Sequence, residues 1–336
     1  MGKDTLLNDD DAVEALLGKA APRPVPPDVE TEAVREVVRA EWQKVTGQRR
    51  SRRRVTQWAM AASVLAAVFV TLNLLRTSGI EPQQVATIDK QFGPISVLGE
   101  DSQLLQHNNL ERIVAGQTVR TSADSGLGLA WSGGGSLRID ANSRVEFLST
   151  DAVYLHDGRI YFDSAPVLSA RSRSGSDVKL TVHSRFGEVA HIGTQYMAQM
   201  DGVGLTISVR EGEVVVQPER GDAARAGRNQ QMAISGSGVR SIVNIQPHGG
   251  SWQWVEQTSP AANLDGRSVN DFLGWVSHET GLTLSYESNA ARSYAEEKIL
   301  NGKLETGPRE ALNIWMLGED LEWRIDNGVI YVSQAR

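Results

Sequence analysis

The sequence predicts a multidomain, membrane-anchored protein. Its parts are a short α-helical cytoplasmic tail, one transmembrane helix, an all-β exported domain and a small α+β domain at the C-terminus. Three observations predict this order. Residues 58–75 are apolar and uncharged, residues 93–245 alternate short strand-like runs with turn residues, and residues 261–336 alternate strands with helices. Residues 76–92 and 246–260 are the predicted linkers.

The apolar stretch is predicted to cross a membrane once. About 18 residues without an ionisable side chain, at about 1.5 Å of rise each, just reach across a hydrocarbon core of roughly 30 Å. Arginines crowd its N-terminal side, which predicts that residues 1–57 are cytoplasmic and that the C-terminus is outside. The anchor residues are Trp58, Leu65, Phe69 and Leu75, and the arginines that set the topology are Arg49, Arg50, Arg52, Arg53 and Arg54.

Two other interpretations of this stretch fit less well. A buried helix of a soluble domain rarely follows an arginine cluster directly, and a cleavable signal peptide needs a much shorter lead. Residues 51–55 resemble a twin-arginine export signal. Such a signal would change the machinery that exports the chain, but the predicted topology would stay the same.

Composition excludes several classes of function. The 336 residues are 40% hydrophobic and 22% charged, as in ordinary globular proteins, and the formal net charge of -7 argues against a nucleic-acid binder. With no cysteine there are no disulfides, thiolate metal sites or cysteine nucleophiles. His183 and His191 share a strand face without a third ligand, so no metal is expected, and no cofactor motif is present. Because no HExxH, GxSxG or paired-carboxylate pattern occurs, an enzyme is not expected.

The tail is predicted to form two short helices around the proline-rich segment Pro22–Pro27. The second helix carries apolar side chains at helical spacing: Val34, Val37, Val38, Trp42 and Val45. So short a segment cannot bury this stripe by itself, which favours a partner protein in the cytoplasm. Packing against the first helix, or on the membrane surface, is the alternative.

The exported β domain is predicted to be a sandwich or a β-solenoid-like stack. Its glycine clusters lead into strands and not into helices, which predicts turns and not phosphate-binding loops. These predicted turns are Asp124–Gly126, Gly133–Gly135, Asp157–Gly158, Asp201–Gly202 and Glu211–Gly212.

The order of motifs in this domain resembles the periplasmic domain of FecR-like transmembrane sigma-factor regulators. The resemblance is carried by Ala115–Thr121, Gly135–Ile139, Leu155–Phe162, Phe186–Tyr196 and Val209–Val216. It implies an anti-sigma factor in the bacterial inner membrane, whose tail binds an extracytoplasmic-function sigma factor. The stripe on the second tail helix, together with Glu41, would be the binding surface. Residues 249–260 do not fit the pattern.

The C-terminal residues read as β-α-β-β-α-β-β, with a capping box at Ser268 and Asp271 and a helix stop at Gly281. This order resembles the short domain at the N-termini of secretins and of signal-transducing TonB-dependent receptors. The resemblance implies docking onto the signalling domain of an outer-membrane receptor, and an open sheet edge offers a physical route. Alternatively, both edges are covered and the module only stabilises its neighbour.

Gly193 and Thr194 raise a separate hypothesis. A threonine hydroxyl can attack the preceding carbonyl when the backbone is strained, giving an ester that water cleaves. The resemblance implies such self-cleavage for some members. The simpler interpretation is that Gly193 adopts an unusual backbone angle and Thr194 packs as a β-branched residue.

Two functions therefore stand at this point. The favoured one is a single-pass signal transducer that links an outer-membrane receptor to a sigma factor, and contact with the lipid bilayer, without direct nucleic-acid binding, follows from it. The alternative is a membrane-anchored periplasmic scaffold with an inert tail.

Overall fold

The structure is a computed structural model that describes residues 13–14, 17–19, 32–42, 83–99, 104–107, 110–168, 178–318 and 320–335. The chain divides into two compact units, Met1–Gly79 and Ile80–Arg336. The first unit contains the tail and the second contains all of the strands of the described part, so each is treated by itself.

In the first unit, residues 32–42 form a helix. It falls within the second predicted tail helix. The predicted membrane span, residues 58–75, lies outside the described residues, as do the five arginines before it. No helix in the described part of the chain is both long enough and apolar enough to cross a membrane.

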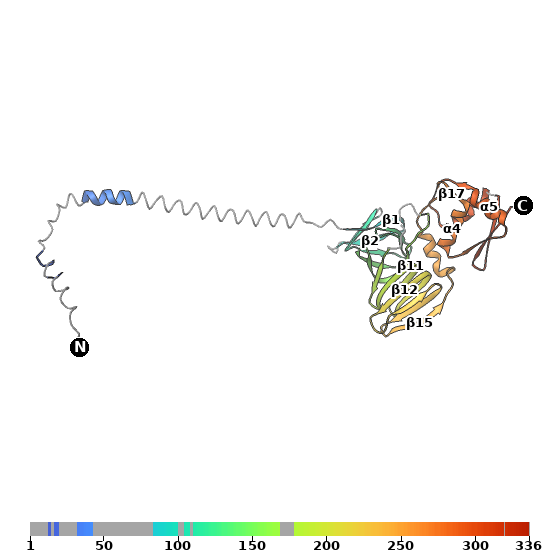
Figure 1. Ribbon diagram of the computed structural model, residues 1–336, viewed down its shortest axis with the longest axis horizontal. Coiled ribbons are helices and arrows are strands. Elements are labelled where there is room, and N and C mark those ends of the chain that lie inside the picture. Colours follow the sequence, from blue (N-terminus) through green and yellow to red (C-terminus); the bar gives the residue numbers. More distant parts are fainter. Residues whose placement is uncertain are drawn as a thin grey trace, which may run out of the picture. The chain divides into compact units, whose positions relative to one another are not determined.

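The second unit begins with fifteen strands, which we call the β domain (Figure 1). Its strands are β1 (Gln84–Phe92), β2 (Ile95–Leu98), β3 (Leu104–His107), β4 (Arg112–Val114), β5 (Thr118–Thr121), β6 (Gly126–Trp131), β7 (Ser136–Ile139), β8 (Arg144–Ser149), β9 (Ala152–Asp163), β10 (Thr181–Ser184), β11 (Gly187–Met200), β12 (Leu205–Pro218), β13 (Ala224–Gly227), β14 (Gln230–Ser235) and β15 (Gly238–Asn244). The β-rich character predicted from the sequence is confirmed.

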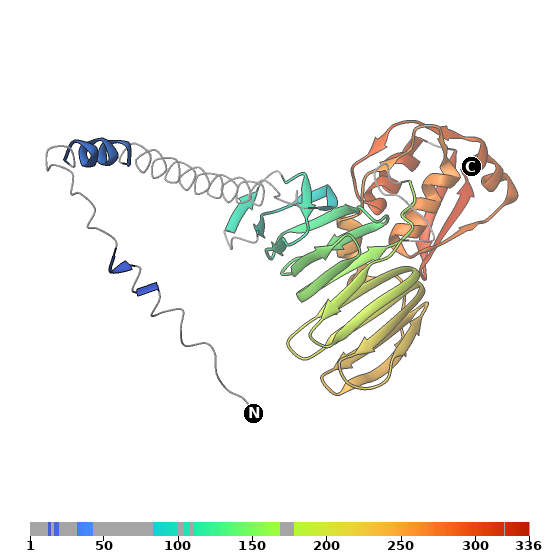
Figure 2. The same cartoon turned by 60° about the vertical axis from the view of Figure 1, so that its left-hand side comes forward.

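All fifteen strands belong to one hydrogen-bonded sheet. Its longest path runs β15-β14-β12-β11-β10-β9-β7-β6-β1-β4, and the remaining strands pair at its sides. The sheet closes over one continuous hydrophobic cluster, to which β1, β6, β9, β11 and β12 all contribute buried side chains. Figure 2 shows the long strands of this sheet stacked side by side.

Long strands change partners along their length, and glycines mark the points of change. The first half of β9 pairs with β8 and the second half with β7 and β11, and Gly158 lies between them at φ +91°. In β12, Gly212 lies at φ +77° within the strand. The sequence predicted turns at both places, and this was wrong, because a left-handed glycine bends these strands without ending them. The other three predicted turns do join strands.

Two segments predicted as linkers contain regular structure. Strand β1 lies within residues 76–92 and pairs with β4 and β6. Residues 246–260 contain a 3₁₀ turn (Gly250–Trp252) and the short helix α3 (Gln253–Gln257). Trp252 and Val255 are buried there, against Tyr161 and Met197 of the β domain. The connection between the domains is therefore part of the core.

After α3 the chain forms a small α+β module, which we call the C-terminal module. Its elements are β16 (Ala262–Asn263), β17 (Arg267–Ser268), α4 (Val269–Thr280), β18 (Thr283–Tyr286), α5 (Asn289–Glu297), β19 (Ile299–Leu300), β20 (Lys303–Leu304), α6 (Pro308–Trp315), a 3₁₀ turn (Met316–Gly318), β21 (Leu321–Asp326) and β22 (Val329–Gln334). Helix α5 was not predicted.

Helix α4 begins and ends where the sequence predicted. Ser268 and Asp271 exchange both hydrogen bonds of a capping box, and Gly281 ends the helix at φ +70°. One face of α4 is buried in the module core, where Trp275 is 0% exposed. The bounds of α4 also determine which residues form its last turn, and this turn faces the β domain.

Candidate functional site

The predicted sigma-binding stripe lies on helix 32–42. Val34, Val37, Val38 and Trp42 are 63%, 69%, 60% and 68% exposed, respectively. Val34, Val38 and Trp42 line one hollow of about 370 Å³ and so share a face of the helix. Glu41 lies on the same helix, whereas Val45 lies outside the described residues. This surface can bind a partner through apolar contact, as exposed helical stripes do.

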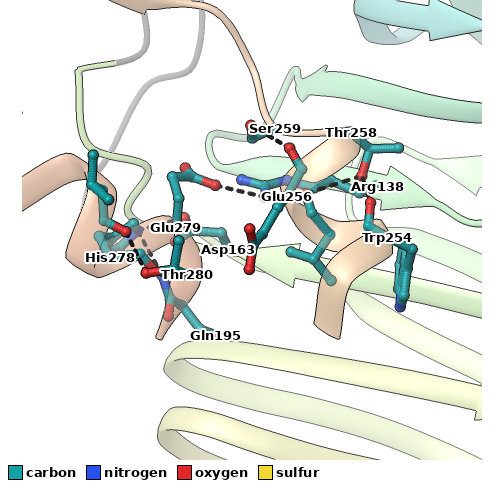
Figure 3. Close-up of polar contacts among 12 residues, drawn as sticks. Arg138, Asp163, Gln195, Trp254, Glu256, Thr258, Ser259, His278, Glu279 and Thr280 are labelled. Carbon is teal, nitrogen blue, oxygen red and sulfur yellow. Dashed lines mark hydrogen bonds and ion pairs between the residues drawn. The ribbon is translucent and has the colours of Figure 1, made fainter. Parts of the chain in front are cut away.

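In the second unit, the last turn of α4 contacts the β domain through buried charges (Figure 3). Arg138 of β7 donates from Nη1 to the Glu279 carboxylate at 2.7 Å, and the two side chains are 0% and 1% exposed. The same nitrogen donates to the main-chain oxygen of Val255 in α3 at 2.9 Å. One arginine therefore joins β7, α3 and α4.

A second pair lies beside the first. The Asp163 carboxylate, at the end of β9, accepts from Nε2 of His278 at 2.7 Å, and the side-chain amide of Gln195 lies 2.6 Å from the same ring nitrogen. Burial alone would raise the pKa of Asp163 and lower that of His278. The ion pair and its hydrogen bond, together with smaller effects from Arg138 and the Ala165 N–H at Asp163 and from Glu279 at His278, outweigh burial. The pKa of Asp163 is therefore lowered and that of His278 is raised.

A second arginine binds the end of the helix itself. Arg210 of β12 donates to the main-chain oxygens of Pro247 at 2.7 Å and Glu279 at 3.0 Å. Its guanidinium also lies 4.4 Å from the ring centroid of Trp252. The last carbonyls of a helix have no partner within it and carry partial negative charge, so a cation is favoured here.

A third ion pair connects α3 to α6. Arg309 donates from Nε to Glu256 at 2.8 Å, and the Glu256 side chain is 8% exposed. Burial raises the pKa of Glu256, although Arg309 opposes this shift. The β domain and the C-terminal module are thus held together by paired charges as well as by apolar packing.

Three residues of the first two ion pairs form the one group in the described part of the chain that could hold a metal ion. Side-chain ligand atoms of Asp163, His278 and Glu279 lie within 4.8 Å of one another. However, Arg138 already supplies a positive charge to the Glu279 carboxylate, and the Nε2–H of His278 donates a hydrogen bond to Asp163. The arrangement fits a structural ion-pair network, and we assign no metal to it. His183 and His191, the pair considered from the sequence, are not part of this group.

A polar cavity of about 670 Å³ borders the network. Its wall includes Gln195, Arg210, Ser277 and His278. Solvent therefore reaches one side of the His278 contact, although the ring is mostly buried.

The Gly193–Thr194 segment is a bulge in β11, next to Gln195. Ile192 pairs with Glu213 and Gln195 pairs with Glu211, so two residues of β11 face Gly212 alone. Gly193 lies at φ +55°, and the Thr194 hydroxyl is buried without a hydrogen-bond partner in the described structure. A Cβ at Gly212 would overlap the Gly193 carbonyl oxygen and lie 2.7 Å from the Thr194 methyl. The unusual backbone angle inferred at Gly193 is confirmed.

Residues 117–215 match the family model described as FecR protein. This segment is a FecR domain. It runs from the residue before β5 into β12, and it includes Arg138, Asp163, Gln195, Arg210 and the Gly193–Thr194 bulge. The resemblance inferred from the sequence is therefore confirmed. Every β-domain residue that contacts the end of α4 in the network above belongs to the FecR domain.

The chain is also similar to solved structures. Two crystal structures of a proposed anti-sigma factor from Parabacteroides distasonis ATCC 8503, at 1.65 and 2.50 Å resolution, are 13% and 12% identical to the chain. Each covers 65% of this chain and 99% of its own, with TM-scores of 0.33 and 0.32. None of the curated proteins matches the chain.

Sequence reasoning found the Gly193–Thr194 segment but not the charge network around the FecR domain. Arg138 and Arg210 stand inside strands, and nothing local distinguishes them from surface arginines. A signal was available only in part. Arg138 lies between Leu137 and Ile139 in a strand whose residues are all buried, whereas Arg210 lies between Val209 and the charged Glu211.

Proposed function

We propose that this protein is a single-pass anti-sigma regulator of the bacterial inner membrane. In this proposal the tail binds an extracytoplasmic-function sigma factor in the cytoplasm. The FecR domain and the C-terminal module, in the periplasm, respond to the signalling domain of an outer-membrane TonB-dependent receptor. The observation that carries the proposal is the FecR domain at residues 117–215.

The tail supports the cytoplasmic half of the proposal. Three apolar side chains on one helical face are each at least 60% exposed: Val34, Val38 and Trp42. Covering them with a partner would bury a valine-and-tryptophan surface of the kind that anchors helices in grooves. A sigma factor held in this way would be kept from RNA polymerase until the periplasmic half changes state.

The C-terminal module supports the periplasmic half. Its three-stranded sheet has the order β18-β22-β21, and within the described residues β18 and β21 each pair with β22 alone. Such sheet edges can accept a strand from another protein. The receptor's signalling domain is the partner we propose for this module.

A binding experiment tests the cytoplasmic half. The full chain, purified from membranes in detergent, should retain a sigma factor identified by mass spectrometry. Trp42→Ala should weaken retention at least tenfold, because a buried tryptophan at an interface contributes about 2 kcal/mol or more. Glu36→Ala, on the opposite face of the same helix, is the matched control and should bind normally.

A periplasmic scaffold with an inert tail is the competing function. It predicts that deletion of residues 1–45 leaves transcription unchanged and disrupts an envelope assembly. The regulator predicts the reverse, with genes of the sigma factor's regulon changing expression. Retention of no sigma factor by the wild-type chain would contradict the proposed function.

We propose self-cleavage at Gly193–Thr194 as a second activity. The observation that favours it is the Thr194 hydroxyl, which is buried and has no hydrogen-bond partner among the described residues. Such a hydroxyl is not held by another acceptor and is available to attack the Gly193 carbonyl carbon. Intact-mass measurement of the membrane-bound chain should find fragments 1–193 and 194–336, and Thr194→Ala should abolish them.

A further inference from the structure

We propose that Ser164 is a positioning residue for cleavage at Gly193–Thr194. The proposal rests on the self-cleavage proposed above and adds a residue to it. Ser164 directly follows β9, and it is 5% exposed beside Thr194, which is 2% exposed. It contacts the nitrogen of the peptide bond that would break.

The contact extends the ladder between β9 and β11 in an unusual way. That ladder pairs Asp163 with Gln195, so the next pair along it is Ser164 with Thr194. The Ser164 N–H donates to the Thr194 oxygen at 3.0 Å, as in an ordinary antiparallel pair. The Thr194 N–H, however, donates to the Ser164 side-chain Oγ at 2.9 Å.

This replacement matters because a hydroxyl can both accept and donate a hydrogen bond, whereas a main-chain carbonyl only accepts. As long as Gly193–Thr194 is an amide, Ser164 Oγ accepts from its N–H. Once that nitrogen has become an amine with a free lone pair, the same hydroxyl can donate to it. Ser164 therefore stays bonded to the nitrogen before and after the bond breaks.

Ester formation needs no reactant besides the chain itself. The Thr194 hydroxyl oxygen forms a bond to the Gly193 carbonyl carbon, and the carbon–nitrogen bond breaks. The hydroxyl proton passes to the Thr194 nitrogen, which becomes the amine of a Gly193 ester. Water then hydrolyses this ester to a Gly193 carboxylate and a free Thr194 hydroxyl.

The peptide is held from the opposite side as well. The Gly193 carbonyl and the Thr194 methyl pack so closely on Gly212 that a Cβ there would collide with both. Ser164 fixes the nitrogen, and Gly212 limits movement of the carbonyl. The Thr194 hydroxyl, with no hydrogen bond in the described region, remains available to attack.

The test compares Ser164→Ala with Ser184→Ala in the full chain. Ser184 is the matched control because it is also a buried serine of the FecR domain, 6% exposed, and its hydroxyl also bonds the main chain, at Gly187 and Phe186. Intact mass follows the fragments with time. Added hydroxylamine converts the ester to a Gly193 hydroxamate, so ester formation is read separately from hydrolysis.

We expect Ser164→Ala to slow ester formation about tenfold, the effect of one hydrogen bond of about 1.4 kcal/mol at the reacting group. Ser184→Ala should leave the rate unchanged while both variants melt at similarly lowered temperatures. If Ser164→Ala forms ester at the wild-type rate, or if both variants are slowed alike, this inference is overturned and self-cleavage stands. If the wild-type chain stays whole in hydroxylamine, self-cleavage fails and Ser164 has no such role.

Discussion

Arg138 and Glu279 form a fully buried ion pair of 2.7 Å between the FecR domain and the last turn of α4. A charge in this setting is stable only with its partner, since removing one partner leaves the other desolvated and unpaired. We expect the pair to favour one fixed contact between the two parts. Separation of the parts would expose both charges to water, which restores their solvation.

Glu279→Gln should destabilise the second unit by about 3–5 kcal/mol, because Arg138 then stays buried without a counter-charge. Urea unfolding followed by tryptophan fluorescence measures this. Arg138→Met combined with Glu279→Leu should recover much of the loss, since neither charge remains. The exposed pair Arg225–Glu213 is the control, and Glu213→Gln there should cost under about 1 kcal/mol. Equal losses for the two single variants would contradict this account.

The pair His278 and Asp163 predicts a pH dependence of stability. The pKa of His278 is raised on folding, so its contribution is fully present below the unfolded value of about 6.5 and is lost as pH rises through the folded value. The pKa of Asp163 is lowered, so its contribution is present above about 3.9 and is lost in more acidic solution. The melting temperature should therefore fall as pH rises above about 6.5. His278→Asn should remove this fall.

His191 provides an internal reference for that measurement. Burial lowers its pKa to about 4, so the folded state binds this proton less readily than the unfolded state. Stability should therefore rise between pH 4 and roughly 6.5, opposite in sign to the His278 effect. That rise should survive in His278→Asn. Persistence of the decline above roughly pH 6.5 in this variant would assign it to another group.

Gly212→Ala and Gly193→Ala should differ although both glycines lie at positive φ. Either alanine costs about 1–2 kcal/mol for the left-handed backbone. At Gly193 the Cβ would meet open space, whereas at Gly212 it would collide with Gly193 and Thr194. Crowding adds roughly 1–3 kcal/mol at Gly212. Equal changes in the free energy of unfolding would show that the bulge yields easily.

Arg210→Lys should lower the free energy of unfolding of the second unit by about 1.5–3 kcal/mol, the usual contribution of hydrogen bonds from a charged group. A lysine ammonium lacks the fixed fork with which the guanidinium binds the Pro247 and Glu279 oxygens, and it loses the guanidinium's contact over the Trp252 ring. Urea unfolding measures the change. Arg228→Lys, an exposed arginine on the wall of the same cavity, should have little effect.

Local signals in the sequence determined much of this fold. Ser268, Asp271 and Gly281 set the bounds of α4, because capping groups act on the backbone within a few residues. The alternation of apolar and polar residues predicts most of the strands, because it too is a pattern among residues that are close in sequence. Such patterns do not distinguish a turn from a bend, so they predict turns at Gly158 and Gly212, where the strands in fact continue. A glycine has the same sequence appearance in both, and only the pairing partners on either side decide which one forms.

By itself, the sequence determined the β-rich FecR domain, the small α+β module after it, the apolar stripe on the tail helix and the unusual backbone at Gly193. All of these depend on residues near one another in the chain. Only the tertiary structure decided that Arg138 pairs with Glu279, that His278 meets Asp163 and that Ser164 contacts Thr194. Each of these contacts joins strands or domains far apart in sequence, and its strength comes from burial, which no local pattern encodes.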